Sequence, residues 1–282
     1  MMYGFMLAGA ADPGLVADAL SEAFDLPLHL VDVAPESEME HRNWDATVTC
    51  DYEVTSGDIH CLLSVYGAEE VTSPPGEEEL ARILARKSDA PVLISWGTLP
   101  WIRKVVRPEG RATFARVEER DDEGAGYRVY ATEDAVAAFP GAAVEKFPEV
   151  VRDVPVATPV ADGLFSGSDS HDVAAEVRRL LWAWEAMISR MAADWPPSHW
   201  YGAEMYREDL QSRDQLELAL TTLNPEARAT VAAVLPALDA RFRSLTVDDG
   251  GSELATALRP TAQDLPVEPW YWRRRPARAP WA

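Results

Sequence analysis

The sequence is short of cysteine and lysine and has no long apolar run. Only 2 of its 282 residues are cysteine, too few for the disulfide framework of a small secreted domain. No stretch of about 18 uncharged apolar residues occurs, so no membrane-spanning helix is predicted. The first residues also lack the basic segment of a secretory signal peptide. These absences predict a cytoplasmic protein with no membrane partner.

The short motifs that are typical of common enzyme chemistries are absent as well. The sequence contains no glycine-rich phosphate loop, no HExxH zinc motif, no GxSxG nucleophile motif and no EF-hand loop. Ser170, His171 and Asp172 are the residue types of a hydrolase triad, but adjacent residues at a helix start point in different directions. We predict a helix N-cap there instead. The sequence therefore predicts no cofactor and no enzyme activity.

Two runs in which apolar and polar residues alternate predict a β-hairpin: residues 46–54, residues 59–65 and a two-residue turn at Ser56-Gly57. The predicted register places Cys61 opposite Tyr52. It places Cys50 opposite Leu63, with both thiols on the apolar face. We expect the two cysteines to behave as small buried hydrophobic residues.

The same hairpin carries residue types that bind metals: Cys50, Asp51, His60 and Cys61. Strand pleating places Asp51 and His60 on the face opposite the two thiols, so the four side chains cannot converge on one ion. On that polar face, His60 is predicted to pair with Glu53. No metal site is predicted.

Acidic charge is abundant and unevenly placed. The chain has 47 Asp and Glu against 26 Lys and Arg, a formal net charge of −21. Residues 1–79 hold 17 of these acids and a single base, Arg42. Such a field repels nucleic acid and steers cationic partners, so we predict that the segment binds a basic protein and no nucleic acid; the alternative is that the charge serves solubility. The predicted partner-binding residues are Glu36, Glu38, Glu40, Asp45, Asp51, Glu53, Asp58, Glu69 and Glu70.

The order of the expected elements indicates two domains and the α+β class. Strands and helices alternate over residues 1–154, where Asp12-Pro13 caps the first helix. This pattern predicts a mixed α/β domain in which helices cover one face of a mainly antiparallel sheet. Proline, glycine and serine predict a linker over residues 155–168. Residues 169–282 predict an all-helical domain with a basic aromatic tail.

Several single elements follow from local signals. Leu28–Val33 predicts a strand, and Thr132 predicts the cap of a short helix that runs through Phe139. Residues 121–124 predict a turn. Asn224-Pro225 predicts the start of a long helix, which contains Pro236.

Aromatic residues gather in the C-terminal part of the chain. Seven tryptophans lie there, and we predict that they fill a small helical core, with a surface stripe that binds a partner or a sugar as the alternative. The tail Trp270–Arg278 is the single basic patch of the sequence. We predict that it folds back onto acidic residues of its own chain through cation–π and ionic contacts; the alternative is a phosphate backbone.

Three stretches carry a resemblance to a known family: YREDLQSRDQL (206–216), LDARFRSL (238–245) running on to DDG (248–250), and WYWRRRP (270–276). They resemble actinobacterial immunity-type proteins, which neutralise a cognate polymorphic toxin by binding it. The resemblance covers residues 206–276. It implies a helical portion that follows a variable α+β portion, and it implies that the N-terminal half recognises the toxin.

Charge and resemblance together predict an immunity-type inhibitor that binds a cognate toxin with a basic surface. Two alternatives belong to other functional classes. A hydrolase that uses a pair of carboxylates is the first, because acids are plentiful. A non-catalytic assembly or scaffold subunit, whose helical half packs against another copy, is the second.

Overall fold

The computed structural model describes residues 1–10, 12–38, 40–120, 126–165, 175–258, 265–266 and 268–281. It divides into two compact units, Met1–Phe147 and Pro148–Ala282, which we call unit 1 and unit 2. Unit 1 is built on a mainly antiparallel sheet and unit 2 mainly on helices, so the predicted α+β class is confirmed. Within the described ranges, no helix is long and apolar enough to cross a membrane.

Along the chain, the boundary between the two units falls after Phe147, whereas the sequence composition predicts a domain boundary after residue 154. The segment 155–168, predicted as a linker, contains the helix α4 (Pro159–Phe165). The carboxylate of Glu185 accepts hydrogen bonds from the backbone N–H groups of Val160 (2.9 Å) and Ala161 (2.7 Å) at the start of α4. A tertiary contact thus satisfies the donors at this helix end, which composition cannot reveal.

The sheet of unit 1 contains β1 (Met2–Leu7), β2 (Val31–Pro35), β3 (Val48–Val54), β4 (Ser56–Gly57), β5 (Cys61–Gly67), β6 (Val92–Ser95), β7 (Ile102–Val106), β8 (Ala112–Arg120), β9 (Gly126–Thr132) and β10 (Ala143–Val144). Its main path runs β10-β9-β8-β7-β6-β1-β5-β3-β2. The pairs β2–β3 and β9–β10 are parallel, and the other neighbours on this path are antiparallel.

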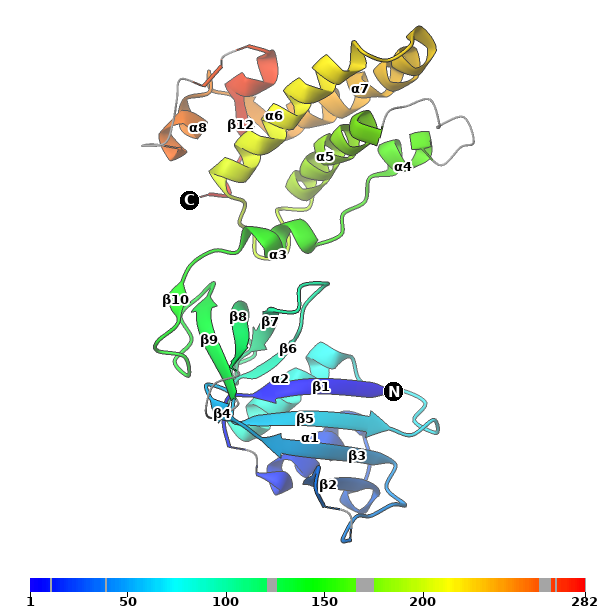
Figure 1. Cartoon of the computed structure of the whole chain (residues 1–282), viewed down its shortest axis with the longest axis vertical. Helices are drawn as coiled ribbons and strands as arrows, with labels where there is room; N and C mark the ends of the chain where they lie inside the picture. Colours follow the sequence, from blue (N-terminus) through cyan, green and yellow to red (C-terminus); the bar gives the residue numbers. More distant parts are fainter. Residues whose placement is uncertain are drawn as a thin grey trace. The chain divides into compact units, whose positions relative to one another are not determined.

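Two helices, α1 (Pro13–Phe24) and α2 (Glu77–Ser88), cover one face of the sheet, behind β1, β5, β3 and β2 in Figure 1. The carboxylate of Asp12 accepts hydrogen bonds from the backbone N–H groups of Gly14 and Leu15, so the predicted N-cap is confirmed. The core between helices and sheet is apolar and includes Phe5, Leu20, Leu63, Val65, Leu80 and Leu84.

The sheet also closes on itself through β4. Only Thr55 separates β3 from β4, and β4 pairs in parallel with β9, with Ser56 opposite Gly126. A Cβ atom on Gly126 would lie 2.3 Å from the carbonyl oxygen of Ser56, and Gly57 has a φ of 88°, so both positions require glycine. The strands share a second apolar core, made of Met6, Ile59, Leu93, Val105, Ala115, Val117, Val129, Val136 and Phe139.

The β3–β5 hairpin forms, but its predicted register is wrong by two residues. Cys61 lies opposite Val54, and Glu53 lies opposite Leu62 instead of His60. The register differs because the turn is wider than two residues: its central residues pair with β9 as β4. Both cysteine thiols are buried, as predicted, and burial raises the pKa of Cys61 to about 11.

Two other local predictions in unit 1 are wrong. Leu28–Leu30 forms a 3-10 turn, and the strand begins at Val31. No helix forms over residues 132–139, because Thr132 is the last residue of β9. The predicted turn at 121–124 and the predicted N-cap at 170–172 lie outside the described residues.

Unit 2 contains α3 (Pro148–Asp153), α4, α5 (Ala175–Ala192), α6 (Ala203–Leu220), α7 (Pro225–Leu245), α8 (Ser252–Ala257), a 3-10 helix (Trp270–Arg273), β11 (Thr246–Asp248) and β12 (Arg274–Pro276). The expectation of an all-helical domain needs one correction, because β11 and β12 pair as an antiparallel ribbon. The side chain of Asn224 accepts from the backbone N–H of Ala227 at 2.8 Å, which confirms the predicted cap of α7. Pro236 lies inside α7.

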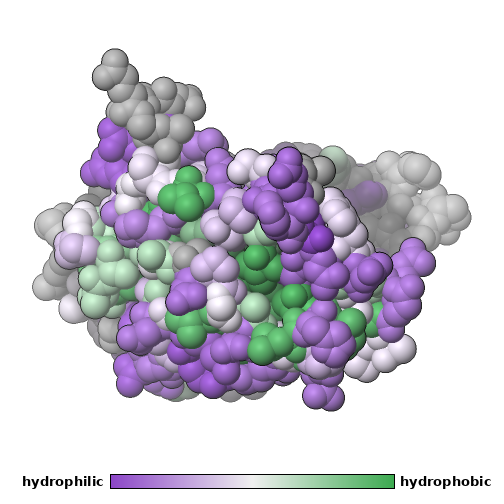
Figure 2. Space-filling model, turned by 90° about the horizontal axis from the view of Figure 1, so that it is seen from below, coloured by the Kyte–Doolittle hydropathy of each residue, from purple (hydrophilic) through white to green (hydrophobic). Residues whose placement is uncertain are grey.

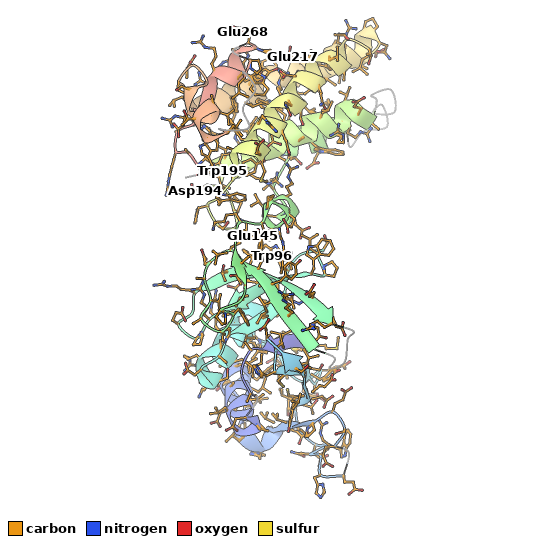
Figure 3. The ribbon with its side chains drawn as sticks, turned by 60° about the vertical axis from the view of Figure 1, so that its left-hand side comes forward. Trp96, Glu145, Asp194, Trp195, Glu217 and Glu268 are labelled. Atoms are coloured by element: carbon orange, nitrogen blue, oxygen red, sulfur yellow. The ribbon has the colours of Figure 1, made fainter. Side chains whose placement is uncertain are left out.

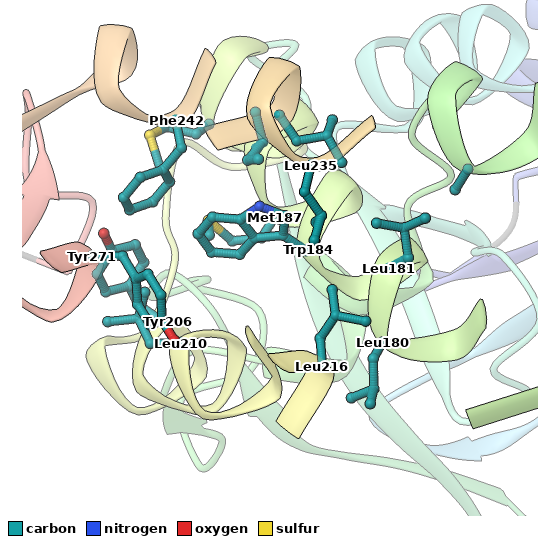
Figure 4. Packing of buried hydrophobic residues seen from close by; sticks show 14 of the residues in the cluster. Leu180, Leu181, Trp184, Met187, Tyr206, Leu210, Leu216, Leu235, Phe242 and Tyr271 are labelled. Carbon is teal, nitrogen blue, oxygen red and sulfur yellow. The ribbon is translucent and has the colours of Figure 1, made fainter. Parts of the chain in front are cut away.

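Large aromatic side chains fill the core of unit 2, as predicted. Figure 4 shows Trp184 of α5 between residues of α6 and α7, with Phe242 and Tyr271 nearby. The ring centroid of Trp184 lies 4.8 Å from that of Phe242 and 5.9 Å from that of Tyr271. Trp272 and Trp195, the latter labelled in Figure 3, are also buried.

The basic aromatic tail is part of unit 2. The hydroxyl of Tyr271 donates a hydrogen bond of 2.5 Å to the carboxylate of Asp214. The indole N–H of Trp272 donates to both oxygens of the same carboxylate, at 3.0 and 3.2 Å. Arg275 forms an ion pair with Glu253 at 2.5 Å. The prediction that the tail folds back onto acids of its own chain is therefore confirmed.

Candidate functional site

One face of the β1-β5-β3-β2 sheet is not covered by the helices of unit 1. Because side chains alternate along a strand, the residues between the buried core positions point to this second face. The register aligns them in rows across the strands, with Met2, Tyr66 and Thr49 in one row and Gly4, Ser64 and Asp51 in the next. The third row, Met6, Leu62 and Glu53, runs from the second apolar core at Met6 to the exposed Glu53. We call this surface the open face.

The open face is accessible to solvent. Met2 is 72% exposed and Tyr66 is 42% exposed. A Cβ atom built on Gly4 would meet no atom within 4 Å, so no described residue crowds the middle of the face. In Figure 2, which views the molecule from the β2 end of unit 1, hydrophilic side chains surround separate hydrophobic areas.

The connection between β2 and β3, residues 36–47, carries four of the predicted binding acids, and we call it the acidic loop. Parallel neighbours need a connection that returns to the start of the next strand, and most proteins use a helix for it. Here the described part of the connection contains no helix. Arg42 fixes this loop to the open face through ion pairs of 2.5 Å with both Asp32 and Asp51.

The Arg42 contact is nearly buried. The Arg42 side chain is 7% exposed, and it is the one base of the first 79 residues. Burial lowers the pKa of its guanidinium group, but the hydrogen bonds and charges of Asp51 and Asp32 raise it more, so the net shift is upward. Asn43 adds two bonds: its side chain donates to His29 O at 2.9 Å and its N–H to Asp32 at 3.1 Å.

A small cavity of about 200 Å³ opens beside this contact. Its lining combines carboxylates with aromatic and hydroxyl groups, from Glu36, Asp51, Tyr52, Glu53, Leu62, Ser64 and Tyr66. Small-molecule sites commonly measure about 300–1,000 Å³, so this cavity is closer to the size of one side chain than to that of a substrate pocket.

The structure brings most, but not all, of the nine predicted acids to this region. Glu36, Asp51 and Glu53 line the cavity, and three more predicted acids lie on the acidic loop. Glu69 and Glu70 follow β5, next to the start of β3, where Ala68 N–H donates to Thr47 O. Two of the nine have local structural contacts: Glu38 on the loop accepts from the N–H groups of the following turn, and Asp58, the ninth acid, accepts from Val129 N–H at the β4–β9 closure.

Two carboxylates on the helix-covered side of unit 1 are paired with two bases each. Glu22 of α1 pairs with Lys87 and Arg86, and the hydrogen bond from Lys87 is the main cause of its lowered pKa. Glu78 of α2 pairs with Lys104 and Arg82, and its pKa is lowered mainly by Lys104. Within the described part of the chain, no basic partner contacts six of the predicted binding acids, which are Glu36, Glu40, Asp45, Glu53, Glu69 and Glu70.

Exposed apolar side chains accompany these acids, and the sequence analysis did not single them out. Trp44 on the acidic loop is 68% exposed, and Val54 at the end of β3 is exposed as well. With Met2 and Tyr66, they place large apolar surface among unpaired carboxylates. A sequence signal for Trp44 was its position two residues after Arg42, the single Lys or Arg of residues 1–79.

Unit 2 contains two other candidates. The carboxyl group of Asp209 accepts a hydrogen bond from Tyr201, and burial raises its pKa to about 6. A cavity of about 570 Å³ is lined almost entirely by apolar residues of 154–159, 192–193 and Pro196, with Arg241 as its one charged lining residue. Among the described residues, no group of three His, Cys, Asp or Glu side chains could hold a metal ion.

Comparisons with protein-family models, with curated proteins and with solved structures find no match to this chain.

Proposed function

We propose that this chain is a non-catalytic inhibitor of the immunity type, which acts in the cytoplasm and binds a basic protein toxin. The binding surface consists of the open face and the acidic loop of unit 1. It needs no cofactor, because binding alone blocks the partner.

The observation that carries the proposal is the pairing of the carboxylates. Glu22 and Glu78 on the helix side have two bases each, whereas Glu36 and Glu53 beside the cavity have no basic partner among the described residues. An acidic surface without internal counter-charges attracts a basic partner over a distance and raises the rate of association.

Apolar exposure on the same surface supports the proposal. Protein interfaces combine a polar rim with aromatic and methionine side chains that lose water on binding. Trp44, Tyr66 and Met2 supply such side chains among the acids. The unpaired charge also disfavours a second copy of this chain as the partner, because two acidic faces repel one another.

The test is to mix the purified full chain with the product of its neighbouring gene and to measure association and dissociation rates at several salt concentrations. We expect a stoichiometric complex whose association rate falls as salt rises. The double variant Glu36→Gln/Glu53→Gln should associate more slowly than the wild type.

Asp18→Asn/Glu79→Gln is the matched control, because it also removes two negative charges, but from exposed positions on α1 and α2. If both double variants slow association equally, only net charge matters and the open face is not the binding surface. A complex whose association rate ignores salt would contradict the electrostatic part of the proposal.

The carboxylate-lined cavity supports a hydrolase as a second candidate. Glu36 of the acidic loop and Asp51 and Glu53 of β3 line it together. Paired carboxylates at such a site can serve as general acid and base. A glycoside hydrolysis assay that detects turnover by the wild type and none by Glu53→Gln would favour this candidate over inhibition.

A further inference from the structure

Trp44 is the most exposed aromatic side chain among the described residues, with 68% of its surface accessible. It lies on the acidic loop, next to Asp45, in a segment that is otherwise mainly polar. A large aromatic ring in water forgoes the free energy that burial would give it. An exposed tryptophan in such a position is therefore a candidate contact residue for a partner.

The backbone on both sides of Trp44 is held in place. Arg42 is bound to Asp32 and Asp51 at 2.5 Å, and Asn43 bonds to His29 O through its side chain. Asp45 N–H donates to the side chain of Asn43 at 3.2 Å. The indole thus projects from a fixed loop, so a partner that contacts it orders little additional chain.

The structure already contains one guanidinium on this ring. The Cζ atom of Arg42 lies over the indole of Trp44, 5.7 Å from the ring centroid, while its nitrogens bind two carboxylates. An aromatic ring together with carboxylates is a suitable environment for a guanidinium group, through cation–π attraction and charge-assisted hydrogen bonds.

The rest of the ring offers the same chemistry to an incoming group. Glu40 and Asp45, on the same loop, have no basic partner among the described residues, and the solvent-exposed surface of the indole is free to stack. Arginine suits this surface better than lysine, because its flat guanidinium stacks on rings and carries less tightly held water.

We propose that the exposed face of Trp44 binds an arginine side chain of the partner, with the acidic loop supplying the counter-charge. The proposal rests on the proposed function, because it assumes that the partner is a basic protein. It adds to that function a specific chemistry: arginine is recognised in preference to lysine.

The experiment titrates the full-length chain with hexa-arginine and with hexa-lysine at one salt concentration and measures both affinities by calorimetry. A cation–π contact at an exposed site contributes about 0.5–1 kcal/mol, so the wild type should prefer hexa-arginine by about two- to fivefold. In Trp44→Ala this preference should disappear, and in Trp44→Phe it should persist in part. Trp101→Ala is the matched control, since Trp101 is 46% exposed in unit 1, and it should keep the full preference.

Equal affinity of the wild type for the two peptides would overturn the proposal, and so would a preference that survives in Trp44→Ala. The proposed function fails in a different way, when Glu36→Gln/Glu53→Gln binds both peptides as tightly as the wild type. If neither peptide binds the wild type, both the arginine proposal and the proposed function are rejected. Circular dichroism of each variant checks that the fold is retained.

Discussion

Replacing Asp209 by asparagine should stabilise this protein at neutral pH. Asp209 lies in α6, and its carboxyl group accepts a hydrogen bond from Tyr201. Burial raises its pKa, and this effect outweighs the opposing influence of the Tyr201 bond, Arg152 and Arg190. An asparagine carbonyl can accept the same Tyr201 bond without carrying a charge.

The size of the effect follows from the pKa difference between the folded and unfolded chain. The pKa of Asp209 rises from an ordinary 3.8 to about 6, which corresponds to at most about 3 kcal/mol. The folded chain holds this proton more tightly than the unfolded chain does. The ionised carboxylate therefore costs stability above pH 6, and this cost is relieved as the pH falls from about 6 to about 4.

The assay is urea unfolding of the full-length chain between pH 4 and pH 7.5, followed by tryptophan fluorescence. Seven of the ten tryptophans belong to unit 2, so the signal reports mainly on the unit that contains Asp209. Asp209→Asn should exceed the wild type by about 1–3 kcal/mol at pH 7 and by almost nothing at pH 4. The exposed Glu226→Gln in α7 is the control, and it should show no such pH-dependent gain. An Asp209→Asn variant that is less stable at pH 7, or a difference that does not change with pH, would refute the reasoning.

Four other substitutions test the fold. Gly126→Ala should lower the free energy of unfolding by about 2 kcal/mol or more in a thermal melt, because its Cβ would lie 2.3 Å from the carbonyl oxygen of Ser56. Gly4→Ala meets no atom within 4 Å and should change it by less than about 1 kcal/mol. Arg42→Gln should speed amide hydrogen exchange in residues 40–46 while α1 and α2 exchange as before, and unchanged exchange in the loop would show that Arg42 does not fix it. Asp214→Ala leaves two aromatic donors unpaired and should cost unit 2 about 2–4 kcal/mol in urea unfolding, with a loss under about 1 kcal/mol arguing against its role in holding the tail.

Local sequence signals predicted the elements whose causes are local. The caps at Asp12 and Asn224 need only their own side chain and the next N–H groups, and both are present. The hairpin register failed because a distant strand decides it: Ser56 and Gly57 pair with β9, about 70 residues later in the chain. The predicted helix ending at Phe139 failed similarly, since Thr132 continues a strand that pairs with β8.

For the predicted binding acids, too, the sequence reveals local features but not the contacts that distant parts of the chain make. Charge density along the chain predicts a binding region, but it cannot tell which acids have internal partners. Asp58 accepts from Val129 N–H at the closure of the sheet, and Asp51 is paired with Arg42. Trp44 was missed because its exposure depends on the path of the loop, which only the parallel pairing of β2 and β3 reveals.

The arrangement of charges in unit 1 supports our proposal of a basic partner over a role in solubility alone. Solubility depends on net charge and is indifferent to which carboxylates have partners. Yet four bases of unit 1, Arg82, Arg86, Lys87 and Lys104, pair with just two acids of the helix side, Glu22 and Glu78. On the open side Arg42, the single Lys or Arg of residues 1–79, is held by two carboxylates, while Glu36, Glu40 and Glu53 have no basic contact among the described residues. Unpaired like charges on one surface destabilise the chain that carries them, and a basic partner relieves that repulsion on binding.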